Sequence, residues 1–162
     1  MQRSQTQSNP RGWIRVPPPF LFAAPLLLGL FVDSREPLIR LSGALGNEAR
    51  WLGIALIVIG AAHALSSVAL FVRSRTTLVP HGRAAVFVTR GAYRWTRNPM
   101  YLGLSLIYLG ISAFCLALWP VLLLPLPILA LDRRVIPMEE RQLEAIFGAP
   151  YVAYRGRVHR WL

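Results

Sequence analysis

The chain has 162 residues, of which 54% are hydrophobic, 18 are basic and 7 are acidic, giving a net charge of +11. With glycine counted and tyrosine left out, the apolar share is about 58%, against roughly 45–50% in soluble domains, so the composition excludes an ordinary water-soluble core and also a disordered chain. The single cysteine, Cys115, excludes an internal disulfide and any cysteine-based metal cluster.

The first two uncharged stretches predict two helices that cross a membrane. Residues 16–32 form a stretch of 17 residues that opens with three prolines, which are tolerated at the start of a helix. Residues 51–72 form a stretch of 22 residues, close to the number that one crossing needs. A cleaved signal peptide is an alternative for the first stretch, because Arg3, Arg11 and Arg15 precede it. No small-residue cleavage site and following soluble domain support that alternative.

The third uncharged stretch, residues 98–131, predicts a helical hairpin broken by proline. A straight helix over its 34 residues would be about 51 Å long, which is too long for one crossing. Trp119 and Pro120 are the expected corner, because proline disfavours helix at the preceding residue. Residues 99–118 would then span the bilayer, and residues 120–131 would reach about 18 Å unless the helix continues through residues 132–134.

The arginines gather in alternate connections. Three precede the first crossing, six lie in residues 73–97 without any acidic residue, and six follow residue 131. Arginines favour the cytoplasmic side of a membrane, so we expect both termini, and any site built from these segments, on the cytoplasmic face of the inner membrane. Anionic lipids explain such a basic rim, so no nucleic-acid partner is expected.

Residues 137–147 predict a short amphipathic helix at the membrane surface, with Pro137 at its start and Gly148 past its end. Its apolar stripe is centred about 30° from Glu139, whereas Glu140 lies at the edge of the stripe. A carboxylate on a face expected to be buried must be paired or used for binding. Two interpretations stay open, a ligand contact and an ion pair with one of four arginines: Arg133, Arg134, Arg155 or Arg157.

Two further features carry polar groups at membrane depth. The turn over residues 91–103 crowds glycine, proline and aromatic residues, and its Arg97-Asn98-Pro99 sequence looks like a helix start with free backbone donors. His63 lies inside the second crossing, where an ionisable residue suggests function, although a neutral histidine bonded to a neighbouring helix is the favoured interpretation. The three histidines have no metal-like spacing, and no metal is expected.

At these residues the chain resembles the isoprenylcysteine carboxyl methyltransferase family of integral membrane methyltransferases and its bacterial relatives. The resemblance covers roughly residues 76–162, in the family's order and spacing. It rests on three motifs: Gly91-x-Tyr93; Arg97-Asn98-Pro99-Met100-Tyr101-x-Gly103; and Glu139-Glu140 followed by Phe147-Gly148-x-x-Tyr151-x-x-Tyr154.

The resemblance implies a multi-helix membrane fold that takes S-adenosylmethionine from the cytosol and a lipophilic acceptor from the bilayer, without a metal. Carried over by position, the cofactor contacts are Val86, Phe87, Val88, Tyr93, Asn98, Pro99, Met100, Tyr101 and Glu139. Asn98 stands where eukaryotic members have histidine, an exchange typical of bacterial relatives.

The acceptor side of the site is implied in the same way. The family's acceptor-binding arginine aligns with Val135, so Arg133 and Arg134 beside it are the candidates for substrate binding. An anionic carboxylate acceptor would be oriented by Arg134 or Arg157. An amine or thiol acceptor would need a base, for which Glu140 is the nearest candidate.

The sequence therefore predicts an all-α membrane bundle of about four crossings and a surface helix, in one domain over residues 1–162. Residues 1–75 would form the first two crossings, and residues 76–162 the methyltransferase-like core. The predicted function is methyl transfer from S-adenosylmethionine to a small lipophilic or lipid-linked carboxylate, amine or thiol. The alternatives are an NADPH-dependent membrane reductase of the sterol reductase type and a non-enzymatic scaffold that binds anionic lipid.

Overall fold

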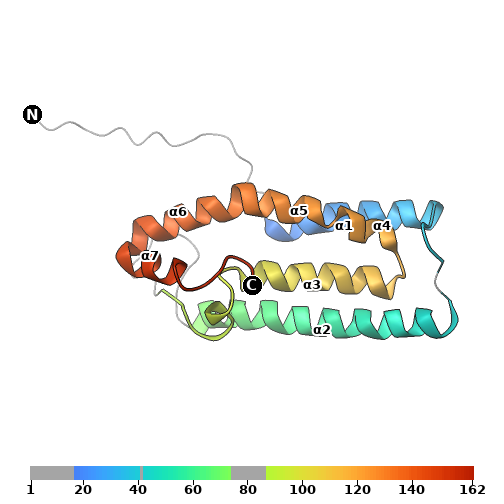
Figure 1. The fold of residues 1–162 in the computed structure, drawn as a ribbon, viewed down its shortest axis with the longest axis horizontal. Coiled ribbons are helices and arrows are strands. Elements are labelled where there is room, and N and C mark those ends of the chain that lie inside the picture. The colour runs from blue at the N-terminus through green and yellow to red at the C-terminus, as the bar shows by residue number, and fades with distance from the viewer. Residues whose placement is uncertain (1–16, 41, 74–86) are drawn as a thin grey trace, which may run out of the picture.

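The computed structural model describes residues 17–40, 42–73 and 87–162, and in these ranges the chain is helical, without a strand (Figure 1). Val86, one of the expected cofactor contacts, lies outside the described residues. The described elements are α1 (Pro18–Arg35), α2 (Gly43–Arg73), the 3₁₀ turn η1 (Gly91–Arg94), α3 (Pro99–Phe114), α4 (Leu118–Leu123), α5 (Pro125–Ala130), the π-helical turn η2 (Leu131–Val135), α6 (Ile136–Phe147) and α7 (Ala149–Arg155).

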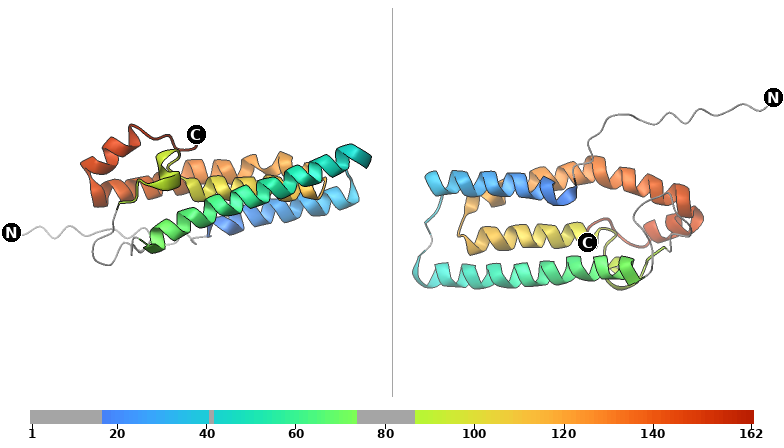
Figure 2. Two further views of the ribbon diagram at one scale, coloured as in Figure 1. Left: turned by 90° about the horizontal axis from the view of Figure 1, so that it is seen from below. Right: turned by 180° about the vertical axis from the view of Figure 1, so that it is seen from behind.

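The long helices run side by side along one axis, with α3 between α2 and the layer formed by α1, α4 and α5 (Figure 1). Beyond the end of this bundle lie α6 and α7, and the C-terminus returns to the start of α3 (Figure 2).

The two helices α2 and α3 pack almost backbone to backbone because glycines face each other twice along the interface. A Cβ added at Gly60 would lie 2.7 Å from the carbonyl oxygen of Gly103, and one added at Gly53 would lie 2.6 Å from that of Gly110. Real side chains do not approach so closely. These four glycines therefore set the spacing of the two helices, as small residues do between membrane helices.

At the other end of the bundle, α1 holds the start of α4. The carboxylate of Asp33 accepts hydrogen bonds from the backbone N–H groups of Leu118 (3.0 Å) and Trp119 (3.3 Å). The indole Nε1 of Trp119 donates to the carbonyl of Glu36 (2.8 Å). These bonds satisfy N–H groups that a helix start leaves without partners.

The hairpin exists, but its predicted corner at Trp119 and Pro120 is wrong. The turn lies between α3 and α4, where Leu116 has a positive φ of 56°. Pro120 is the third residue of α4, in the first helical turn, where the missing N–H would have no intrahelical partner in any case.

The elements α4, α5, η2 and α6 follow one another without leaving the right-handed helical region, since Leu124, Ala130 and Ile136 at the junctions all have helical φ and ψ. Pro125, Pro127 and Pro137 lack the N–H groups that would complete a single regular helix. The expected surface helix over residues 137–147 is thus the end of this rod, as α6.

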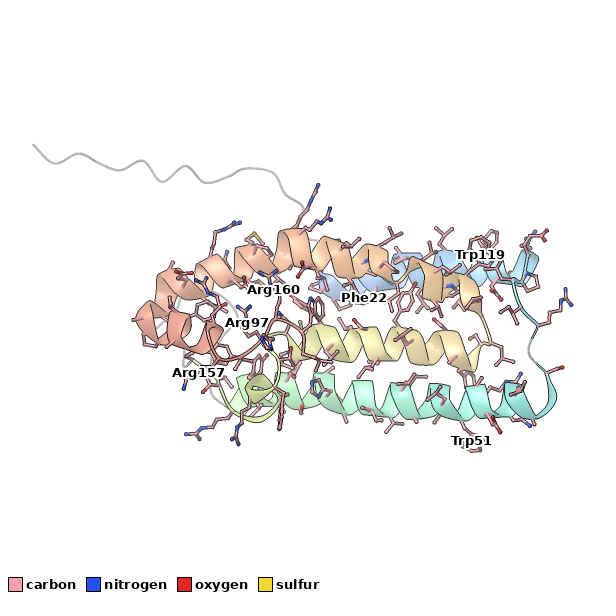
Figure 3. All side chains as sticks on the ribbon, in the orientation of Figure 1. Phe22, Trp51, Arg97, Trp119, Arg157 and Arg160 are labelled. Atoms are coloured by element: carbon pink, nitrogen blue, oxygen red, sulfur yellow. The ribbon has the colours of Figure 1, made fainter. Side chains whose placement is uncertain are left out.

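Within the described ranges, one helix segment is long and apolar enough to cross a membrane, Gly43–Leu70 in α2, with a mean hydropathy of 2.0. Only 17% of its most apolar window is buried, so its outward face is apolar and open, as at Trp51 (Figure 3). The all-helical class is confirmed and a membrane location is supported, while four crossings stay a prediction.

Candidate functional site

Two of the sequence motifs meet at a short hydrogen bond. Tyr101, in the first turn of α3, donates its hydroxyl to Oε1 of Glu139, in the first turn of α6, at 2.6 Å. Tyr101 is almost fully buried, and Glu139 is half-buried. Burial raises the pKa of Glu139 above its ordinary value; the hydrogen bond from Tyr101 opposes this rise and the nearby charge of Glu140 adds to it.

Glu140 lies between two arginines from distant parts of the chain. Its Oε1 is 2.8 Å from Nη1 of Arg97, and its Oε2 accepts a bond of 2.7 Å from Nη2 of Arg160. Arg160 also donates from Nη1 to Asp132 at 3.0 Å. The hydrogen bond to Glu140 raises the pKa of Arg160, although burial works against it. The two arginines lie near each other beneath α6 (Figure 3).

The predicted burial order of the two glutamates is wrong, because the side chain of Glu140 is only 11% exposed and Glu139 is the less buried of the pair. The helical wheel assumed that apolar contacts alone decide which face of the helix is buried. In the structure, Arg97 and Arg160 supply charged partners on one side of α6 and allow a carboxylate to be buried there.

The C-terminal segment is held against the turn before α3 by three hydrogen bonds. The backbone N–H of Arg97 donates to the carbonyl of His159 at 2.9 Å. The Thr96 hydroxyl and the Asn98 side-chain amide both donate to the carbonyl of Arg160, at 3.1 and 2.9 Å. The side-chain amide of Asn98, an expected cofactor contact, therefore holds the tail in this structure.

An aromatic cluster closes the other side of the site. The ring of Phe87 lies 5.1–5.8 Å, between centroids, from those of Phe147, Tyr151 and Tyr154. The Tyr154 hydroxyl donates to the carbonyl of Tyr93 at 2.7 Å. Burial raises the pKa of Tyr154 to about 12, so this hydroxyl stays a donor at neutral pH.

The other residues expected to contact the cofactor differ in how deeply they are buried. Pro99 is fully buried, Val88 is half-buried, and Met100 packs on the core cluster that contains Tyr101 and Leu131.

The arginines proposed for the acceptor are all exposed. Arg133 and Arg134 lie on η2, and the Nε of Arg157 donates to the carbonyl of Ala153 at 3.2 Å. Arg155 pairs with Glu144 at 2.7 Å, so it is not the partner of Glu139.

Sequence reasoning missed Arg160, Thr96 and Asp132 as members of this site. The ion pair considered from the sequence was one of Glu139 with Arg133, Arg134, Arg155 or Arg157, whereas the structure pairs Glu140 with Arg97 and Arg160. Spacing along the sequence could not show which carboxylate these two arginines reach. In the part of the chain that the structure describes, no group of three or more His, Cys, Asp or Glu side chains could hold a metal ion.

A protein-family model described as PEMT, phospholipid methyltransferase, matches residues 49–150, more than half of the chain. No curated protein matches the chain. The matched family contains the isoprenylcysteine carboxyl methyltransferases, so the resemblance noted in the sequence is confirmed. The match includes most of α2 and both members of the Tyr101–Glu139 hydrogen bond.

Proposed function

The chain belongs to the phospholipid methyltransferase family, and on that premise we propose that it transfers the methyl group of S-adenosylmethionine to a lipophilic or lipid-linked acceptor. The observation that carries the proposal is the 2.6 Å bond between Tyr101 and Glu139. It joins two of the three motifs of the resemblance, through residues that are 38 positions apart, into one half-buried site.

The side chains around this bond suit the cofactor in charge and hydrogen-bonding capacity. S-adenosylmethionine carries a sulfonium and an ammonium group together with two ribose hydroxyls. A carboxylate such as Glu139 accepts several hydrogen bonds, so after binding Tyr101 it can still accept from an ammonium or a ribose hydroxyl. The half-buried ring of Tyr93 offers an aromatic face that suits a sulfonium through cation–π attraction, whereas Tyr101 is almost fully buried and contributes its hydroxyl.

When bound, the cofactor supplies an electrophilic methyl group on positively charged sulfur. The chain contributes position, because in-line displacement depends on holding the two reacting atoms close and aligned. The hydroxyl of Tyr101 fixes the rotamer of Glu139. The ion pairs of Glu140 with Arg97 and Arg160 hold α6 and the tail against the start of α3.

We assign Glu140 a positioning role rather than the role of a base, because both of its oxygens are engaged in ion pairs with Arg97 and Arg160, which hold it between the start of α3 and the tail. For an anionic acceptor, the exposed residues Arg133, Arg134 and Arg157 remain the candidates for orientation. The arginine distribution supports placing the site on the cytoplasmic face.

The proposal is tested by calorimetry with S-adenosylhomocysteine on the protein in detergent. We expect binding to the unchanged protein and about 10- to 100-fold weaker binding to Glu139→Ala, since a hydrogen bond to a charged group contributes roughly 1.5–3 kcal/mol. Glu144→Ala is the matched control, because Glu144 lies on the same helix in an exposed pair with Arg155. The proposal would be refuted if the unchanged protein gave no heat of binding with S-adenosylhomocysteine, or if Glu139→Ala and Glu144→Ala bound it with equal affinity.

A further inference from the structure

Arg160, which lies beneath α6 (Figure 3), contacts both segments that carry the expected cofactor contacts, although the resemblance gives it no role. Its backbone carbonyl accepts the side-chain amide of Asn98 at 2.9 Å, in the turn before α3. Its guanidinium binds Glu140 of α6, the residue next to Glu139. One residue near the C-terminus therefore links the start of α3 to the start of α6.

The guanidinium of Arg160 divides its donors between two carboxylates. Nε and Nη2 donate to the two oxygens of Glu140, at 3.1 and 2.7 Å, and Nη1 donates to Asp132 at 3.0 Å. Asp132 lies on η2 and Glu140 lies on α6, so these bonds span the junction of the two helices. A lysine ammonium is a point charge and cannot reproduce this planar contact. The side chain of Arg160 thus fixes how α6 leaves η2, and with it the place of Glu139.

The carbonyl of Arg160 determines which way the amide of Asn98 faces. A carbonyl oxygen only accepts hydrogen bonds, so Nδ2 of Asn98 rather than its Oδ1 must lie against it. The amide oxygen, which is an acceptor, is then on the side away from the tail. The fully buried Thr96 donates its hydroxyl to the same carbonyl and accepts the backbone N–H of Asn98, both at 3.1 Å, so the carbonyl is held in place.

The next residue, Trp161, keeps the tail seated. Its indole Nε1 donates to Asp132 at 3.3 Å, and its ring packs on the buried cluster that includes Tyr101 and Leu131. Arg160 is therefore held by the turn before α3, by η2 and α6, and, through its neighbour, by the core. Such surrounding contacts are what give a binding group a precise position.

We propose that Arg160 is a positioning residue for the cofactor, a role that rests on the proposed function. Its side chain places Glu139 by way of Glu140, and its carbonyl turns the acceptor oxygen of Asn98 away from the tail. Acceptor oxygens from two distant segments are then in place before a ligand arrives, which reduces the ordering that binding requires. The ammonium group, the ribose hydroxyls and the adenine amino group of S-adenosylmethionine are donors that match such acceptors.

A double-mutant cycle of S-adenosylhomocysteine binding, measured by calorimetry on the full chain in detergent, tests the side chain. Arg160→Lys keeps the charge and the carbonyl but loses the planar fork, and we expect it to weaken binding about tenfold. In the Glu139→Gln background the same change should weaken binding by less than about twofold, because the residue through which Arg160 acts is already altered. A merely structural effect would weaken binding equally in both backgrounds. Arg155→Lys, in the exposed pair with Glu144, is the matched control and should change binding in neither background.

The carbonyl of Arg160 is tested at its partner, since no side-chain substitution at position 160 removes it. Asn98→Asp is isosteric and keeps an acceptor oxygen, but it places a second acceptor against the carbonyl. We expect this variant to bind S-adenosylhomocysteine about tenfold more weakly than the unchanged protein and to be cleaved faster by trypsin after Arg160. Asn98→His, which keeps an N–H donor, should recover part of both properties.

The outcomes separate the two proposals. The positioning role would be overturned, and the proposed function left standing, if the losses from Arg160→Lys and Glu139→Gln were additive or if Asn98→Asp bound S-adenosylhomocysteine as tightly as the unchanged protein. No binding to the folded, unchanged protein would refute the proposed function and the positioning role with it. If Arg160→Lys failed to fold, Asp132→Asn takes its place in the cycle, because it weakens the hold on Arg160 from a carboxylate that is 37% exposed.

Discussion

Replacing Glu140 with glutamine should destabilise the fold more than any other single loss of charge on α6. The carboxylate is 11% exposed and Arg97 beside it is 13% exposed, so the Glu140→Gln variant leaves a guanidinium buried without its counter-charge. Breaking a buried ion pair from one side typically costs about 3–5 kcal/mol. Arg160 is 30% exposed and keeps Asp132 at 3.0 Å, which reduces the loss on its side. We therefore expect a cost of about 3 kcal/mol, at the lower end of that range.

The control is Glu144→Gln, because the Glu144–Arg155 pair is 42% and 40% exposed and such surface pairs contribute about 0–1 kcal/mol. Unfolding of both variants in mixed micelles, followed by circular dichroism against increasing dodecyl sulfate, measures the difference. If Glu140→Gln were no less stable than Glu144→Gln, the paired arginines would not be what permits a buried carboxylate here.

Three other changes test separate parts of the structure. Gly60→Ala should lower the free energy of unfolding by about 1–3 kcal/mol, because the new methyl group forces α2 away from α3. Gly156→Ala is the control and should change it little, since no atom lies nearer than 3.7 Å to the new Cβ. Thermal unfolding compares the two variants. The raised pKa of Glu139 means that the folded chain holds this proton more tightly than the unfolded chain does, so the free energy of unfolding should fall as the pH rises above about 4.5. Unfolding curves measured over a series of pH values should lose this dependence in Glu139→Gln. Asn98→Ala should remove one anchor of the tail, costing about 1 kcal/mol, and speed tryptic cleavage after Arg160; unchanged cleavage would contradict the anchor.

Much of the fold follows from the distribution of apolar and charged residues. The uncharged stretch over residues 51–72 predicts most of α2, which begins eight residues earlier, at Gly43, and 34 uncharged residues are enough to predict a hairpin. The hairpin corner was wrong because proline is compatible with the first turn of a helix as well as with a break. Local sequence leaves that choice open, and in the structure Asp33 of α1 caps the helix that contains Pro120.

The site was predictable only as far as its motifs. The order of the motifs predicted that Tyr101 and Glu139 belong to one site, and in the structure these two side chains form a hydrogen bond. The burial of Glu140 depends on Arg160, which is 20 residues away and follows a bend of the tail that no periodicity encodes. Among the described residues, Nε2 of His63 is buried without a hydrogen-bond partner, so the predicted bond to a neighbouring helix is not found for this atom.

The most direct test of methyl transfer uses S-adenosylmethionine with a deuterated methyl group. The protein is incubated with a total lipid extract, and mass spectrometry of the organic phase locates the label. The account predicts a labelled lipid whose formation requires the unchanged protein and falls strongly in Glu139→Ala but not in Glu144→Ala. Absence of labelled lipid with a folded protein that binds S-adenosylhomocysteine, or equal labelling with Glu139→Ala, would contradict it.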